Sequence, residues 1–229
     1  MLAIENIRVA YGQSRIIPEL SMTLEENEIV GVMGRNGMGK TTLLKALIGI
    51  LRADSGSIKL DGQELMQAPT YSRVKSGLAY VPQGRMIFPS MTVTDNIRAG
   101  MEKSREKTVP SYVYDLFPVL KDMGDRKGGN LSGGQQQQLA IARALVTNPK
   151  VLLLDEPTEG IQPSIIKDIA KVLREIRDLK GIAIIVAEQV LSFALEACDR
   201  FLVLESGTFI HSSTRESVDP NEIKQLLSV

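Results

Sequence analysis

Residues 28–42 read Glu-Ile-Val-Gly-Val-Met-Gly-Arg-Asn-Gly-Met-Gly-Lys-Thr-Thr. Residues Glu28–Met33 fit a strand, and a helix pattern runs from Thr41 to about Ile50. Between them, Gly34–Thr41 fits the phosphate-binding pattern G-x-x-x-x-G-K-[ST]. Its glycines let backbone N–H groups approach phosphate oxygens, and the following helix directs the positive end of its dipole at the anion. This stretch therefore predicts a strand, a phosphate-binding loop, a helix and a nucleotide ligand.

Strand and helix patterns alternate on both sides of this stretch. Further strands are expected at Leu2–Val9, Ser57–Leu60, Leu78–Val81, Val151–Leu154, Ile182–Val186 and Phe201–Leu204, and further helices at Gly134–Thr147, Pro163–Leu179, Val190–Ala197 and Asn221–Leu227. Such alternation favours an α/β fold with a mainly parallel sheet. Residues 86–148 have almost no strand character. We therefore predict a helical subdomain at 86–148, inserted into an α/β core made of residues 1–85 and 149–229.

Two carboxylates, Asp155 and Glu156, follow the apolar strand Val151–Leu154. In a nucleotide site, Lys40 would contact the β- and γ-phosphates, while Thr41 and Asp155 would bind Mg²⁺. Glu156 would then be the general base that polarises the attacking water. An acidic turn after a core strand is common in α/β proteins, so this interpretation depends on the phosphate-binding loop upstream.

A third motif, Leu131-Ser132-Gly133-Gly134-Gln135, places Ser132 as the cap of a helix start, which is a ready anion site. With all three motifs, the chain resembles the ATP-binding subunits of ABC transporters over essentially its whole length. The resemblance implies a P-loop NTPase (RecA-like) core with a parallel sheet, an N-terminal antiparallel β-subdomain and an inserted helical subdomain. It also implies that two subunits face head to tail. Ser132, Gly133, Gly134 and Gln135 of one subunit would then bind the γ-phosphate held by the other.

The resemblance assigns ATP and Mg²⁺ as the ligands. The residues that it places on the ATP phosphates are Gly34, Arg35, Asn36, Gly37, Met38, Gly39, Lys40, Thr41 and Thr42. It places Gln83 near Mg²⁺ and the attacking water, and Tyr11 against the adenine ring, where aromatic side chains stack. A lone Gln after a strand is usually a surface turn and a lone Tyr often packs at a strand end, so both assignments depend on the family.

Two positions depart from the common family pattern. Gln189 stands where many members carry a His that senses the γ-phosphate, and Gln162 stands at a usual Asp position. A glutamine amide can donate a hydrogen bond but carries no titrating proton. The pair Glu188-Gln189 is typical of ATPases for branched-chain amino acid and urea uptake. The runs 34–42, 135–143 and 157–163 are most similar to the ATP-binding subunits of urea transporters.

Composition limits the alternatives. The 229 residues carry 27 Lys+Arg and 27 Asp+Glu, so the net charge of +0 gives no sign of nucleic-acid binding. Cys198 is the only cysteine, which excludes an internal disulfide and fits a reducing cytoplasm. No signal peptide is visible, and the apolar stretches are shorter than the ~20 residues that span a bilayer. We expect a peripheral protein on the cytoplasmic face of the membrane.

The predicted function is ATP hydrolysis that drives urea import. The expected partners are a second ATPase subunit, identical or different, transmembrane permeases, and indirectly a solute-binding protein. Branched-chain amino acids are the alternative solute. A non-transport ABC switch is a second alternative, although such proteins usually carry long coiled coils or two motif sets. A third is a dimerisation module without useful hydrolysis, against which Glu156 argues.

Overall fold

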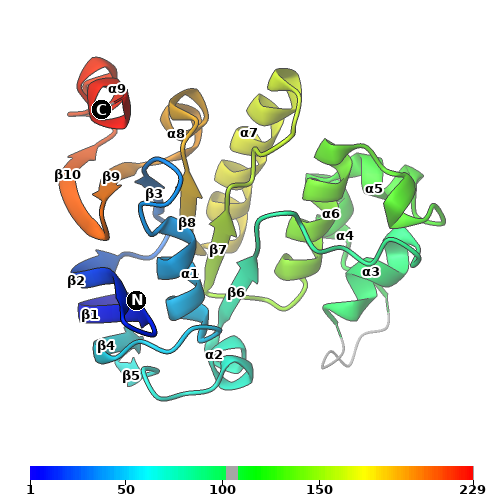
Figure 1. Ribbon diagram of the computed structural model, residues 1–229. Coiled ribbons are helices and arrows are strands. Elements are labelled where there is room, and N and C mark those ends of the chain that lie inside the picture. The colour runs from blue at the N-terminus through cyan, green and yellow to red at the C-terminus, as the bar shows by residue number, and fades with distance from the viewer. Residues whose placement is uncertain (102–107, 229) are drawn as a thin grey trace.

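The computed structural model describes residues 1–101 and 108–228 (Figure 1). The strands are β1 (Leu2–Tyr11), β2 (Ser14–Leu24), β3 (Ile29–Met33), β4 (Ser55–Leu60), β5 (Gln63–Glu64), β6 (Leu78–Val81), β7 (Val151–Asp155), β8 (Ala183–Glu188), β9 (Arg200–Glu205) and β10 (Thr208–Thr214). The helices are α1 (Lys40–Ile48), α2 (Thr70–Ser76), α3 (Val93–Ala99), α4 (Ser111–Leu116), α5 (Pro118–Asp122), α6 (Gly133–Leu145), α7 (Pro163–Lys180), α8 (Leu191–Ala197) and α9 (Pro220–Ser228), and Gly128–Asn130 forms a 3₁₀ turn.

The strands form two sheets. One has four antiparallel strands in the order β2-β1-β4-β5, and the other has six in the order β10-β9-β3-β8-β7-β6. In the six-stranded sheet all neighbours are parallel except the edge strand β10, which runs antiparallel to β9. The predicted α/β fold, with a parallel core sheet and an N-terminal antiparallel sheet, is confirmed.

The six-stranded sheet separates two apolar layers because side chains alternate across it. From β7, Leu152 and Leu154 pack in the layer that contains α6, α7 and α8. Val151 and Leu153 pack in the other layer, with α1 and the four-stranded sheet. Every residue of β7 is buried, as expected for a parallel strand covered on both faces. Helices α1 and α6 therefore lie on opposite faces of this sheet.

Strand β8 lies between β3 and β7, and the three strands run parallel. The segments that leave their carboxyl ends therefore meet at one edge of the sheet, where ligands bind in open α/β folds. The phosphate-binding loop follows β3, and the acidic pair ends β7. The topology thus brings together two motifs that lie far apart in the sequence.

The predicted elements outside 86–148 are all present, with ends that differ by at most two residues. β2, β5, α2 and β10 were not predicted. Strand β2 contains Pro18, which argues against a strand when only sequence is considered. Its register against β1 shifts between the pairs Ile7↔Leu20 and Val9↔Ile17, so Pro18 lies within a local irregularity where its missing N–H is tolerated.

Residues 86–148, where the structure describes them, contain α3 to α6 and the 3₁₀ turn but no strand. The predicted division into a core and an inserted helical subdomain stays a prediction. Within residues 1–101 and 108–228, no helix combines the length and apolar character that crossing a bilayer requires.

Candidate active site

A cavity of about 360 Å³ opens at the carboxyl edge of the six-stranded sheet. Its lining comes from the phosphate-binding loop, from the segments after β6 and β7, and from β2. The lining residues are Ile16, Asn36, Gly37, Gly39, Lys40, Thr41, Thr42, Gln83 and Glu156. All of these residues except Ile16 were predicted from the sequence as site residues, so the structure brings eight of the predicted residues together in one lining.

Gly39 is the N-cap of α1 and has φ 106, a left-handed conformation that glycine adopts without strain. No side chain caps this helix start. Its first N–H groups therefore point toward the cavity without an intrahelical partner, and the positive end of the helix dipole lies beside them. This arrangement favours an anion such as a phosphate.

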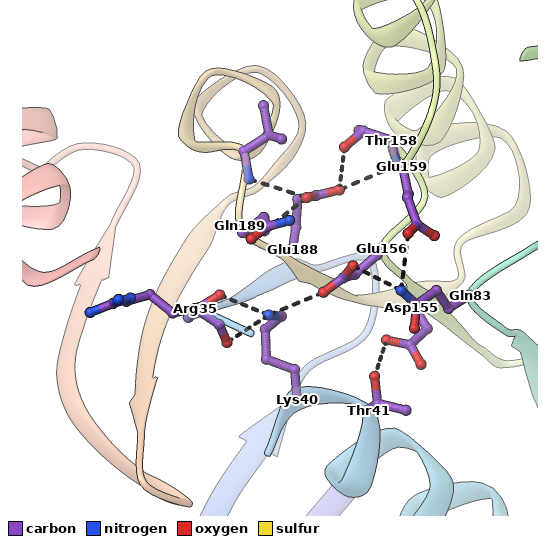
Figure 2. Close-up of polar contacts among 12 residues, drawn as sticks. Arg35, Lys40, Thr41, Gln83, Asp155, Glu156, Thr158, Glu159, Glu188 and Gln189 are labelled. Carbon is purple, nitrogen blue, oxygen red and sulfur yellow. Dashed lines mark hydrogen bonds and ion pairs between the residues drawn. The ribbon is translucent and has the colours of Figure 1, made fainter. Parts of the chain in front are cut away.

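Lys40 is only 4% exposed, and its ammonium is held inside the loop. Its Nζ donates to the carbonyls of Gly34 at 2.8 Å and Arg35 at 3.0 Å (Figure 2). It also lies 3.2 Å from Oε1 of Glu156, which is 8% exposed. A buried ammonium needs a counter-ion, and here Glu156 supplies it. A bound phosphate would offer Lys40 an alternative anion.

Glu156 follows β7 in a left-handed conformation with φ 46. For a residue with a Cβ this costs about 1–2 kcal/mol. The backbone N–H of Glu156 donates to the carbonyl of Ala187 at 2.9 Å, which helps to hold the turn. The carboxylate is directed at Lys40, and its Oε2 accepts from Gln83 Nε2 at 3.3 Å. Gln83 Nε2 also donates to Glu159 Oε1 at 3.3 Å.

Asp155 receives a hydrogen bond on each carboxylate oxygen. Thr41 Oγ1 donates to Oδ1 and Tyr80 OH donates to Oδ2, both at 2.9 Å. Burial raises the pKa of Asp155, and these two hydrogen bonds oppose the increase. Burial likewise raises the pKa of Tyr80, so its phenol stays a donor. Tyr80 was not predicted as a site residue, although it lies in the same segment as Gln83.

The oxygens of Thr41 and Asp155 fit Mg²⁺, which prefers hard oxygen ligands. In the part of the chain that the structure describes, no three His, Cys, Asp or Glu side chains gather into a metal cage. Mg²⁺ characteristically binds one or two protein groups together with substrate phosphates and water. The donor set therefore matches a metal that arrives with a nucleotide.

Ser132 to Gln135 begin α6 and do not line this cavity. Ser132 accepts from the Gln135 N–H at 3.4 Å, and Gln135 Oε1 accepts from the Ser132 N–H at 3.0 Å, a capping box. A Cβ on Gly134 would lie 2.5 Å from Ile165 Cγ2, so only glycine fits against α7. Since α6 and α1 lie on opposite faces of the sheet, this motif does not reach the phosphate-binding loop of its own chain.

Four further predicted residues are not part of this lining, namely Tyr11, Arg35, Met38 and Gln189. Tyr11 is half exposed at the end of β1, whereas Ile16 of the omitted strand β2 does line the cavity. Arg35 and Met38 line a second cavity of about 170 Å³. Gln189 is exposed, and its backbone N–H donates to Glu188 Oε1 at 2.8 Å.

Comparisons with known proteins agree with this arrangement. A sequence model of the ABC transporter family matches residues 17–159, a range that contains all three motifs. The high-affinity branched-chain amino acid transport ATP-binding protein BraG of Pseudomonas aeruginosa is 38% identical, over 93% of this chain and 93% of BraG. The lipopolysaccharide export system ATP-binding protein LptB of Haemophilus influenzae is 33% identical, over 97% of this chain and 94% of LptB.

Solved structures give the same result. An ATP-binding cassette of an ABC transporter, solved in its ADP conformation, matches with a TM-score of 0.84 and 28% identity. The match covers 100% of this chain and 94% of that chain.

Proposed function

The chain belongs to the ABC transporter family as an ATP-hydrolysing subunit, and from this premise we propose that it powers the import of urea through partner permeases. The observation that carries the proposal is the group formed by Lys40, Glu156 and Gln83 around the cavity. It places a phosphate-binding cation, a carboxylate and an amide donor within reach of one reacting centre.

The phosphate-binding loop, residues Gly34–Thr42, holds the triphosphate of ATP through its N–H groups and the start of α1. When the phosphate takes the Lys40 ammonium, the Glu156 carboxylate loses its counter-ion and is free to accept a proton from water. Gln83, already hydrogen-bonded to Glu156, orients that water. Thr41, Asp155 and Gln83 would hold Mg²⁺, which neutralises charge on the phosphate oxygens.

A second ATPase subunit completes the site. Because Ser132 to Gln135 lie on the opposite face from α1, they are available to the phosphate-binding loop of a partner. Ser132 is exposed, and the start of α6 offers N–H groups to a γ-phosphate. The side-chain amide of Gln189 donates a hydrogen bond to the same γ-phosphate, and this amide does not titrate as a histidine would. Tyr11 stacks on the adenine.

The permeases bind in a groove of about 360 Å³ beside the segment that follows Gln83. Its lining, from α2, β6, α3, α6 and the Gln83 segment, includes the exposed apolar side chains Val74, Met86 and Phe88. Arg143 of α6 donates to the Met86 carbonyl at 2.7 Å and stacks on Phe88. A permease segment in this groove would therefore contact the residues adjacent to Gln83.

Two solutes are supported by different observations. The runs 34–42, 135–143 and 157–163 are most similar to those of urea transporter subunits. The 38% identity to BraG favours branched-chain amino acids instead. Uptake of labelled urea and labelled leucine, in cells with and without this gene, separates the two. Loss of urea uptake that wild type restores and Lys40→Ala does not would establish the first. Loss of leucine uptake would establish the second.

The test of the chemical step is Glu156→Gln. We expect ATP binding to remain and turnover to fall by about 10²-fold or more, because the general base is lost. The closed ATP-bound dimer should accumulate, as size-exclusion chromatography with ATP can show. Glu175→Gln, an exposed change on α7, is the control and should hydrolyse ATP normally. Wild-type turnover in Glu156→Gln would overturn the assignment.

A further inference from the structure

The carboxyl end of β8 is bonded to both motif-bearing segments. The carbonyl of Ala187 accepts from the Glu156 N–H at 2.9 Å, and the carbonyl of Glu188 accepts from the Gly34 N–H at 3.3 Å. Strand β8 lies between β3 and β7. The last residues of β8 are therefore placed to fix the phosphate-binding loop and the acidic turn relative to each other.

The side chain of Glu188 adds a second set of bonds at the same point (Figure 2). Its Oε2 accepts from Thr158 Oγ1 at 2.7 Å and from the Thr158 N–H at 3.3 Å. Its Oε1 accepts from the N–H groups of Gln189 at 2.8 Å and Val190 at 3.1 Å. One carboxylate thus joins the turn after β7 to the turn after β8.

This carboxylate is costly for the fold. Glu188 is 1% exposed, and its four hydrogen-bond donors are all neutral. Burial raises the pKa of Glu188 despite these hydrogen bonds. In the part of the chain that the structure describes, no cation is paired with this carboxylate, and burial without such a pair is unfavourable for a carboxylate, so packing alone does not account for a glutamate here.

We propose that Glu188 is a positioning residue for ATP hydrolysis, which holds Glu156 and Gln189 in register with the phosphate-binding loop. Glu156 lies two residues before Thr158 on the turn that Glu188 fastens, and Gln189 is the next residue on the other turn. Glu188 itself is not among the residues that line the cavity. The inference rests on the proposed function, because it assumes that Glu156 and Gln189 act at the γ-phosphate.

The key variant is Glu188→Gln. Its oxygen can still accept from the N–H groups of Gln189 and Val190, but its NH₂ group then faces the Thr158 N–H. The turn that carries Glu156 loses its anchor while the fold keeps its shape. We expect kcat for ATP hydrolysis to fall by about tenfold or more, since small displacements of reacting groups have large effects on rate. KM for ATP should change less than about twofold, because the phosphate-binding loop is intact.

A double-mutant cycle with Thr158 tests whether the effect passes through this contact. Thr158→Val removes the hydroxyl that donates at 2.7 Å, and Thr158→Ser keeps it. We expect Thr158→Val to lower kcat, Thr158→Ser to retain it, and the double variant Glu188→Gln/Thr158→Val to lose less than the product of the single effects. Independent, multiplicative effects would overturn the proposal, as would an unchanged kcat in folded Glu188→Gln.

Asp199→Asn is the matched control. Asp199 lies at the opposite end of the sheet, where Oδ2 accepts from the Ile29 N–H at 2.8 Å and pairs with Arg177. This variant should lower Tm and leave kcat unchanged. Glu156→Gln and Gln189→Ala are measured alongside. If neither lowers kcat, the proposed function of the site fails. If they do and Glu188→Gln does not, only the positioning role fails.

Discussion

The burial of the Glu188 carboxyl group leads to a prediction about stability that is independent of the effect of Glu188 on catalysis. Its pKa in the folded protein lies above the ordinary value of 4.5, chiefly because of burial. A raised carboxyl pKa contributes stability that is fully present below pH 4.5 and is lost as pH rises through the folded value. The wild type is therefore less stable at neutral pH than it is below pH 4.5 on account of this group, and Glu188→Gln, which does not titrate, carries no such loss.

The measurement is Tm against pH for both proteins. The Tm of Glu188→Gln minus that of the wild type should increase as pH rises and level off above the folded pKa. Asp178→Asn supplies the opposite sign, because the bond from Arg177 lowers the pKa of Asp178. That variant should lose Tm relative to the wild type at neutral pH and recover as pH falls. If the Tm difference between Glu188→Gln and the wild type stayed constant across the pH range, burial would not shift the pKa of Glu188.

The C-terminal end of helix α1 is held by hydrogen bonds from one buried side chain. Arg73 of α2 is 2% exposed and donates to the carbonyls of Ala46 at 2.7 Å and Leu47 at 2.8 Å, in the last turn of α1. It also donates to the carbonyls of Met66 and Ala68, each at 2.9 Å. A cation at a helix C-terminus interacts favourably with the helix dipole, so Arg73 stabilises the helix whose start binds phosphate.

Arg73→Met keeps much of the apolar volume but removes the Arg73 donors from these carbonyls, of which Ala46 still accepts from the Gly49 N–H at 3.2 Å. We expect the free energy of unfolding to fall by about 3 kcal/mol or more, because each unsatisfied buried acceptor is costly. Urea unfolding followed by circular dichroism measures this loss. Lys75→Met, two residues away on the exposed side of α2, is the control and should stay within about 0.5 kcal/mol of the wild type. A similarly small change in Arg73→Met would contradict the role.

The same elements show what sequence alone can predict. β3, the phosphate-binding loop and α1 were predicted because a local motif specifies all three together. β2 was not predicted because Pro18 argues against a strand, and the irregularity that accommodates this proline forms only when β2 pairs with β1. The contacts of Tyr80 and Glu188 were not predicted because they depend on strand register. Tyr80 lies opposite Leu153 on the neighbouring strand, two residues before Asp155. Ala187, the residue before Glu188, lies opposite Asp155. Long-range register is not encoded in any short pattern.

At the scale of the whole molecule, the two halves of the predicted ATP site lie on separate faces of one sheet. The cavity with Lys40 belongs to the face covered by α1, and Ser132 begins α6 on the other face. On the proposed function, one chain would therefore supply half of each of two sites. If two copies meet about a two-fold axis, each site combines Lys40 of one copy with Ser132 of the other.

Mixing two inactive variants tests this directly. Lys40→Ala removes the phosphate-binding cation, and Ser132→Arg places a bulky group at an exposed helix start without disturbing the core. Each variant alone should be inactive, because both of its composite sites carry a defect. In a mixed dimer one site carries both defects and the other carries none. Random pairing makes half of the dimers mixed, so ATPase activity should recover to roughly a quarter of the wild-type rate.

No recovery would contradict a site shared between copies of this chain. The experiment would then be repeated by co-expressing each variant with the transporter's other ATPase subunit. In that pairing Lys40→Ala and Ser132→Arg should each inactivate a different one of the two sites, because each site draws its loop from one chain and its signature motif from the other. Recovery in the first experiment requires trans contact, since a site completed within one chain would stay defective in both variants however they are mixed.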